Sequence, residues 1–184
     1  MRSPRPLAGA LAAAALLTGC FTATGSLDAS GAGRLTLLYA PPRHATVQSE
    51  TARFTSDHVT VESIAREGDQ AKAVVTFDDV TRLSTAEALR DLRVFREQDG
   101  ERARLRIVLP PAPEEKRALL RKRAADGTGT GPRVTLDLPG RVLDAGPYGT
   151  AEDARVTWLV PLEAYADEPW VELVVAYAAT PHSM

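Results

Sequence analysis

The sequence predicts an α+β domain with a mostly antiparallel β-sheet and two or three short helices. Runs in which apolar residues alternate with polar ones recur along the chain, as expected for strands. Turn signals such as Glu67-Gly68-Asp69 and Asp99-Gly100 join neighbouring runs into hairpins. The regular alternation of strands and helices that is typical of a doubly wound parallel sheet is absent.

Residues 1–19 have the features of a secretory signal peptide. Arg2 and Arg5 make its start positive, and residues 7–17 form an apolar stretch rich in Ala and Leu. The stretch is too short for a membrane-spanning helix, which needs about 20 apolar residues. It ends in Leu17-Thr18-Gly19-Cys20, which resembles the lipobox of bacterial lipoproteins.

That resemblance implies that a diacylglyceryl group is attached to Cys20 and that the chain is cut before this residue. Cys20 is the only cysteine in the sequence, so no thiol would be left for a disulfide. Two or three acyl chains on one residue hold a protein firmly at a bilayer, whereas a single chain does so only marginally. We therefore expect a lipid anchor at the cell membrane or the outer membrane, with the domain on the exported side.

The charge of the chain excludes one class of partner. The sequence has 22 Lys and Arg residues against 24 Asp and Glu residues, for a formal net charge of −2. Removing residues 1–19 removes two arginines and no acid, which makes the remainder more negative. A chain of this balance lacks the basic surface that nucleic-acid binding requires, so we expect no nucleic-acid partner.

The chain after the signal divides into three expected parts. Residues 20–33 are rich in Thr, Ser, Ala and Gly and predict a flexible tether. Residues 34–179 predict a single α+β domain, and residues 180–184 a short polar tail.

Within the domain, about eight strands are expected. Residues 35–39 end at Pro41-Pro42, and residues 58–66 and 71–77 form a hairpin around Gly68. Residues 94–96 and 104–109 form a second hairpin. Three later strands are expected over residues 134–138, 155–160 and 170–177.

Three segments favour helices. Residues 45–55 fit one helical face, although their threonines would also suit a strand. Ser84-Thr85-Ala86-Glu87 reads as a capping box, flanked by Leu83 and Ala88 as a hydrophobic staple. Residues 114–125 begin with acids and continue with basic residues, as the helix dipole favours, and Leu119 and Leu120 would form the buried side.

No group of residues in the sequence predicts a catalytic or metal site. His44, His58 and His182 have no ligand spacing, so surface positions are expected. Asp78 and Asp79 would point to opposite faces of a strand. Glu114 and Glu115 are explained by the start of a helix, where acids are favoured.

Known motifs are also missing. Gly127-Thr128-Gly129-Thr130-Gly131 follows a helix, whereas a dinucleotide-binding loop follows a strand, so a simple connection is expected. Neither Gly-x-Ser-x-Gly nor Ser-x-x-Lys occurs. We therefore expect no cofactor, no metal and no enzymatic activity.

Two features have open interpretations. The basic run from Lys116 to Arg123 suits a solvated helix face, and the alternative is contact with anionic headgroups. Trp158 and Trp170 lie in or beside predicted strands, where core packing is the default and stacking on a ligand is the alternative.

The order of elements resembles that of LppM-like bacterial lipoproteins. A lipobox is followed by the strand ending Leu37-Leu38-Tyr39-Ala40, by Val75-Thr76-Phe77-Asp78-Asp79-Val80, and by a late strand with Val156-Thr157-Trp158. The resemblance implies a non-enzymatic envelope protein with a cavity or groove for lipids or glycolipids. The chain departs from the family pattern by lacking a C-terminal membrane helix.

Three hypotheses for function follow. The favoured one is a lipid-anchored module that binds a lipid, a glycolipid or another envelope component. The alternative is a structural or assembly lipoprotein that binds another envelope protein. An envelope hydrolase is the third, and it would need a concave site with converging polar groups.

Overall fold

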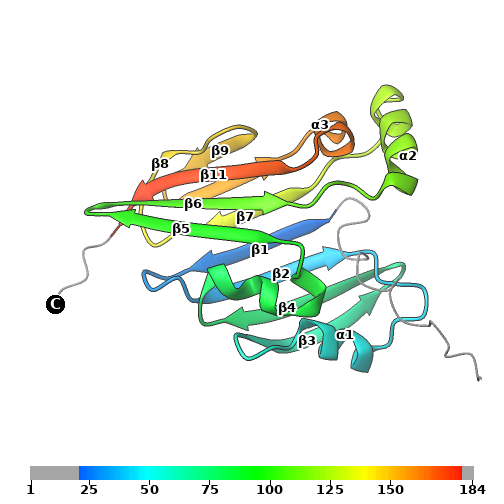
Figure 1. The fold of residues 1–184 in the computed structure, drawn as a ribbon, viewed down its shortest axis with the longest axis horizontal. Coiled ribbons are helices and arrows are strands. Elements are labelled where there is room, and N and C mark those ends of the chain that lie inside the picture. The colour runs from blue at the N-terminus through cyan, green and yellow to red at the C-terminus, as the bar shows by residue number, and fades with distance from the viewer. Residues whose placement is uncertain (1–20, 180–184) are drawn as a thin grey trace, which may run out of the picture.

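The computed structural model describes residues 21–179, which form the α+β fold expected from the sequence. A seven-stranded sheet has the order β3-β4-β2-β1-β7-β10-β9, and a four-stranded sheet has the order β5-β6-β11-β8. Figure 1 shows the smaller sheet in front of one part of the larger sheet, while two short 3₁₀ helices cover another part. All pairings between described strands are antiparallel except that of β1 with β7.

The prediction of a flexible tether over residues 20–33 is wrong for residues 21–33, the part of this segment that the structure describes. Residues Thr22–Leu27 form β1, which pairs with β2 (Gly33–Tyr39) on one side and with β7 (Arg133–Asp137) on the other. The sequence did not predict this strand because it consists mainly of small Thr, Ala, Gly and Ser residues. In the structure Phe21, Ala23 and Leu27 are buried, as expected of a core strand. Because β1 is a central strand, the folded domain begins before residue 34.

The two predicted hairpins are confirmed. In the larger sheet, β3 (Val59–Glu67) pairs with β4 (Gln70–Phe77), and Gly68 takes a φ of 64° in the turn. In the smaller sheet, β5 (Arg93–Asp99) pairs with β6 (Arg102–Leu109), and Gly100 takes a φ of 57°. Both glycines adopt the left-handed backbone that L-residues with a side chain disfavour.

The remaining strands come from the last third of the chain. The sequence predicted β7, β10 (Arg155–Leu159) and β11 (Val171–Ala178), but not the short strands β8 (Val142–Asp144) and β9 (Gly149–Glu152). Trp158 is fully buried, and its indole nitrogen donates a hydrogen bond to the carbonyl of Ala145 at 3.0 Å. The core role expected for Trp158 is confirmed.

Two of the expected helices are present. Helix α1 (Val47–Phe54) is capped by Thr46, whose hydroxyl accepts from the Ser49 amide at 3.1 Å. Helix α2 (Glu114–Ala125) has the expected bounds, but only one of its two predicted core leucines is buried: Leu120 is 3% exposed and Leu119 57%. A third α-helix, α3 (Leu162–Asp167), was not predicted.

The expected helix after Ser84 is wrong. Residues Val80–Thr85 and Glu87–Leu89 form 3₁₀ helices η1 and η2, separated by Ala86 in an extended conformation. The cap is supplied earlier, because Oδ1 of Asp79 accepts from the Thr81 amide at 2.9 Å. An extended residue inside the expected first turn prevents the capping box, yet Leu83 and Ala88 are buried as a staple would require.

Arg96 links the two sheets through hydrogen bonds. From β5, this side chain donates to the carbonyls of Ala29 at 2.5 Å and Ser30 at 3.0 Å, in the turn between β1 and β2. Asp28 holds that turn through Oδ1, which accepts from the amides of Ser30, Gly31 and Ala32 at 2.8 to 3.1 Å. The hydrogen bonds from Ser30 in particular keep the pKa of Asp28 below its ordinary value.

We expect Asp28→Ala to lower the free energy of unfolding by roughly 1 kcal/mol at neutral pH, the usual net value of lost hydrogen bonds. Since the pKa of Asp28 is lowered by folding, its contribution is complete above the ordinary aspartate pKa of about 3.9 and is lost as the pH falls below it. Urea unfolding of both chains over a pH series measures this. A difference between them that does not shrink in acid would contradict the assignment, and Asp28→Asn is the control that keeps the acceptor.

Within the described residues 21–179, no helix has the length and apolar character needed to cross a bilayer.

Candidate binding cavity

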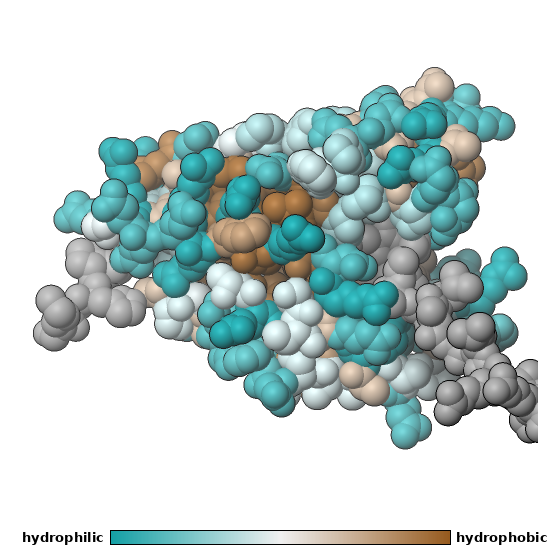
Figure 2. All heavy atoms as spheres, in the orientation of Figure 1, coloured by the Kyte–Doolittle hydropathy of each residue, from teal (hydrophilic) through white to brown (hydrophobic). Residues whose placement is uncertain are grey.

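A cavity of about 820 Å³ lies between the two sheets. Its volume is within the range of about 300–1,000 Å³ that is usual for small-molecule sites. Figure 2 shows apolar surface inside a hollow in the middle of one face, with hydrophilic residues around it. The resemblance to LppM-like lipoproteins implied a cavity or groove, but the residue pattern did not show where it lies, because the space forms only where the two sheets meet.

The inner wall is made by side chains on one face of the larger sheet and by the facing side of the smaller sheet. Alternate residues of β1, β2 and β7 point the same way, as the strand period requires, and nearly all of these side chains are apolar and buried. They are Phe21, Ala23, Leu27, Leu35, Leu37, Phe77, Val134 and Leu136 from the larger sheet, and Val94, Ile107 and Leu109 from the smaller one.

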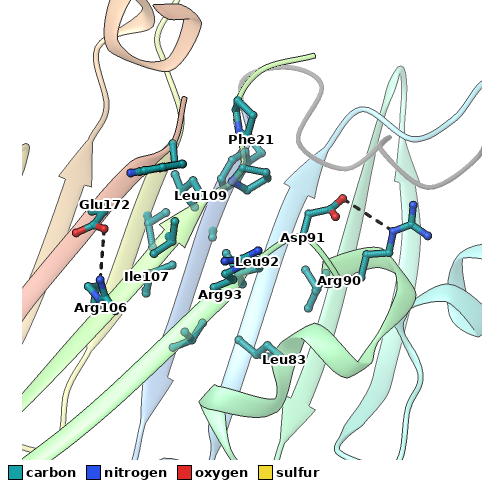
Figure 3. A pocket seen from close by; sticks show the side chains of 18 of the residues that line it. Phe21, Leu83, Arg90, Asp91, Leu92, Arg93, Arg106, Ile107, Leu109 and Glu172 are labelled. Atoms are coloured by element: carbon teal, nitrogen blue, oxygen red, sulfur yellow. Dashed lines mark hydrogen bonds and ion pairs between the residues drawn. The ribbon is translucent and has the colours of Figure 1, made fainter. Parts of the chain in front are cut away.

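Residues 80–92 form the cover on the side of β5. Val80 and Leu83 from η1 and Ala88 and Leu89 from η2 all line the cavity and are buried. The 3₁₀ helices that replaced the expected regular helix therefore place their apolar side chains over the space between the sheets. Figure 3 shows Leu83 and Leu92 on this side, with Ile107 and Leu109 across from them.

Charged side chains gather where the cavity opens. Three of the lining arginines have acidic partners: Arg106 with Glu172 at 3.4 Å, Arg117 with Glu114 at 3.0 Å, and Arg90 with Asp91 at 4.0 Å. Figure 3 shows Arg93 beside Leu92 at the apolar wall, with the pair of Arg106 and Glu172 on one side and the pair of Arg90 and Asp91 on the other. Arg93 is exposed and adds a fourth cation, so this opening has one more cation than anion.

Trp170 lines the opening and is 59% exposed. The expectation that it packs in the core is wrong, because the inward positions of β11 are Val171, Leu173 and the alternate residues after them. Phe95, 41% exposed, also lies at the opening, and the guanidinium carbon of Arg106 stands 4.3 Å from the centre of its ring. Two aromatic side chains are thus available at the edge of an apolar space.

The described groups with shifted pKa values lie away from the cavity. They are Asp28, Arg34, Tyr39, Lys116, Asp137, Tyr148 and Arg155, and none of them lines it. Arg155, for example, lowers the pKa of Asp137 by a hydrogen bond across the β7–β10 pair. These shifts reflect local pairing on the sheets and helices.

His44, His58, Asp78 and Asp79 lie outside the cavity lining. His58 pairs with Asp78 at 3.1 Å, and His44 is exposed. Asp79 caps η1, so the two adjacent aspartates have separate partners. Between residues 21 and 179, His, Cys, Asp and Glu form no group of three or more that could hold a metal.

The other sequence features have simple structural roles or lie outside the described residues. Residues 127–131 connect α2 to β7, and Gly127 takes a φ of 64° after the end of the helix. Glu114 and Glu115 occupy the first turn of α2. Cys20 and His182 lie outside residues 21–179.

The basic run of α2 is partly engaged in pairs. Arg121 binds Asp167 of α3 at 2.6 Å, and Arg117 donates to the carbonyl of Ala112 at 3.0 Å. Burial lowers the pKa of Lys116. Lys122 and Arg123 are exposed on the last turn.

Comparisons with known proteins add information about the fold. No protein-family model and no curated protein matches the sequence. Among solved structures, the chain is similar to the NMR structure of the folded domain of the LppM protein of Mycobacterium tuberculosis, with a TM-score of 0.56 and 10% sequence identity. The match covers 91% of this chain and 94% of that domain.

The two chains share a fold. The resemblance to LppM-like proteins that the order of elements suggested is thereby supported at the level of architecture. At 10% sequence identity, the similarity shows the shared fold but does not show which residues bind a ligand or what that ligand is.

Proposed function

We propose that this protein is a lipid-anchored lipoprotein of the bacterial cell envelope whose domain binds a lipid or glycolipid. The cavity between the sheets is the observation that carries this proposal. Its walls are apolar and its opening has arginines, which suits a ligand with acyl chains and a polar or anionic headgroup. About ten buried methylenes would contribute about 8 kcal/mol to binding, at roughly 0.8 kcal/mol each.

A binding module accounts for the cavity better than the other two hypotheses. A protein-binding role would favour a continuous exposed apolar patch, but the large exposed apolar residues come from different parts of the fold: Val47, Phe95, Leu119, Leu143, Leu159 and Trp170. A hydrolase would favour titratable groups with shifted pKa values in the cavity, and the shifted groups of the described chain lie outside it. Both observations support a binding role.

We expect lipid to co-purify with the chain beginning at residue 20 and carrying Cys20→Ser. The protein is incubated with a bacterial lipid extract, purified again and examined by native mass spectrometry, with about one lipid expected per chain. Absence of any bound lipid would reject the proposal. This variant lacks residues 1–19 and the anchoring thiol, and every described strand and helix is retained.

Filling the cavity should remove that lipid. Ala23 lies on β1 with 4% exposure and lines the cavity, so Ala23→Phe places a ring in the space that the ligand would occupy. We expect at least a tenfold loss of co-purified lipid, and the same from Ala88→Phe on the covering side. Ala151→Phe is the matched control, since Ala151 is exposed on β9 and is not part of the lining. Folded Ala23→Phe and Ala88→Phe chains that still bind lipid normally would place the ligand elsewhere.

A further inference from the structure

The attachment point of the expected anchor is directly next to the folded domain. Phe21 is 6% exposed, lines the cavity, and accepts a hydrogen bond from the Arg133 amide through its carbonyl at 3.0 Å. Residue 20 is bonded to Phe21, and consecutive Cα atoms are about 3.8 Å apart. A lipid on Cys20 therefore holds this part of the domain against the bilayer, because no tether separates the two.

The surface near Phe21 has properties suited to a membrane interface. Figure 1 shows that β1 begins at the end of the molecule where β6 ends, β11 begins, and α2 and α3 lie. Pro111, Pro169 and Trp170 are exposed here, and all three line the cavity together with Phe21. Tryptophan is enriched at membrane–water interfaces because its ring is apolar and its N–H can bind water or headgroups. We call this region, formed by Phe21, residues 110–113, Pro169, Trp170 and α2, the anchor end.

The charges at the anchor end are mixed, with basic residues concentrated on α2 and acidic ones on the neighbouring α3. Helix α2 contains five basic residues and two acidic ones, Glu114 and Glu115. Asp167 of α3 binds Arg121, and Lys122 and Arg123 are exposed on the last turn of α2. Basic residues held close to a bilayer are attracted to anionic headgroups.

We propose that the anchored domain lies with its anchor end against the bilayer, so that the part of the cavity lined by Phe21, Pro169 and Trp170 lies at the headgroups and the cavity exchanges its ligand with the leaflet that holds the anchor. The orientation follows from the direct bond between Cys20 and a wall residue of the cavity, and from the exposed tryptophan at the same opening. The part of the proposal that concerns the ligand rests on the proposed function, and the orientation rests on the lipid at Cys20. The orientation itself can be tested without any cavity ligand.

The two tryptophans of the chain make the test specific. The lipidated full-length product is reconstituted into vesicles of equimolar phosphatidylcholine and phosphatidylglycerol, in which the phosphatidylcholine carries bromine atoms near the headgroup end of an acyl chain. Trp170 is 59% exposed and Trp158 is fully buried, so bromine should quench only Trp170. The Trp170 emission is obtained by subtracting the emission of the Trp170→Phe variant from that of the wild-type chain. We expect this Trp170 emission to be at least twofold lower in brominated vesicles than in vesicles without bromine.

The Ala23→Phe variant separates contact with the bilayer from contact with a lipid inside the cavity. If Trp170 meets the bilayer, quenching persists when the cavity is filled. If quenching disappears in Ala23→Phe, or is absent from the wild-type chain, the proposed orientation is wrong. Neither result affects lipid co-purification by the Cys20→Ser chain, so failure of the orientation and failure of lipid binding are distinguished.

Discussion

A chain that begins at residue 34 is expected not to fold, although the sequence pattern would place the domain boundary there. The deletion removes β1, which has a hydrogen-bonded neighbour on each side. Burial of the Phe21 and Leu27 side chains contributes about 1.5–3 kcal/mol each to stability. Each backbone hydrogen bond between β1 and its neighbours β2 and β7 contributes a further net value of about 0.5–1.5 kcal/mol, which the deletion also removes. Together these losses reach the whole stability of about 5–15 kcal/mol that is usual for a domain.

Circular dichroism, thermal unfolding and dispersion of amide signals in NMR measure the effect. The matched control is the chain that begins at residue 20 with Cys20→Ser, which should be folded and unfold cooperatively. A chain of residues 34–184 with the same midpoint as the control would show that β1 is dispensable. The result also bears on function, because β1 supplies Phe21, Ala23 and Leu27 to the cavity wall.

Glu50→Ala is expected to lower the free energy of unfolding by about 3–5 kcal/mol, the cost of breaking a buried ion pair from one side. Glu50 is 2% exposed on α1, and its carboxylate accepts from the Tyr39 hydroxyl at 2.5 Å and from Nη1 of Arg53 at 2.6 Å. Nε and Nη2 of Arg53 are buried without a hydrogen-bond partner. The Glu50 carboxylate is therefore the main group that neutralises the Arg53 charge, because the Glu87 carboxylate lies farther away, at 3.9 Å from Nε of Arg53.

Denaturant unfolding of Glu50→Ala, Arg53→Met and the double variant Glu50→Leu/Arg53→Met measures the coupling. Replacing both charges with apolar residues of similar size should cost much less than removing Glu50 alone, because no charge is then left buried without a partner. A double variant as unstable as Glu50→Ala would show that packing around α1, and not the ion pair, is responsible. Lipid binding should be unchanged in any variant that stays folded, since neither residue lines the cavity.

The hairpins and α2 could be predicted because their signals are local. Gly68 and Gly100 mark turns between alternating runs, and Glu114 and Glu115 begin a helix after Pro113. Their bounds in the structure agree with the expected ones to within a few residues. By contrast, β1, β8 and β9 show no clear alternation of apolar and polar residues. Pairing with strands distant in the sequence supports β1, through β7, and β8, through β11, whereas β9 is a four-residue strand beside β10.

The resemblance to LppM-like lipoproteins implied a cavity or groove, but its position and lining could not be predicted from the residue pattern. Ala23, Leu37, Val134 and Ile107 belong to four strands, and each reads in the sequence as an ordinary core residue. The local sequence does not distinguish a side chain that packs against another side chain from one that lines a cavity. Trp170 carried a usable signal, because it stands one residue before the alternating buried positions of β11 and so faces outward.

The sequence by itself determined the α+β class, the two hairpins, the long basic helix and the expectation of a lipid on Cys20, because each depends on neighbouring residues. Only the tertiary structure decided that residues 22–27 are a central strand, that the sheets enclose a cavity, and that Phe21 joins the expected anchor to that cavity. These features depend on contacts between segments more than a hundred residues apart, as in the pairing of Thr22 with Arg133. A local pattern contains no information on such pairings, because strand partners are selected by burial and backbone hydrogen bonding in the folded chain.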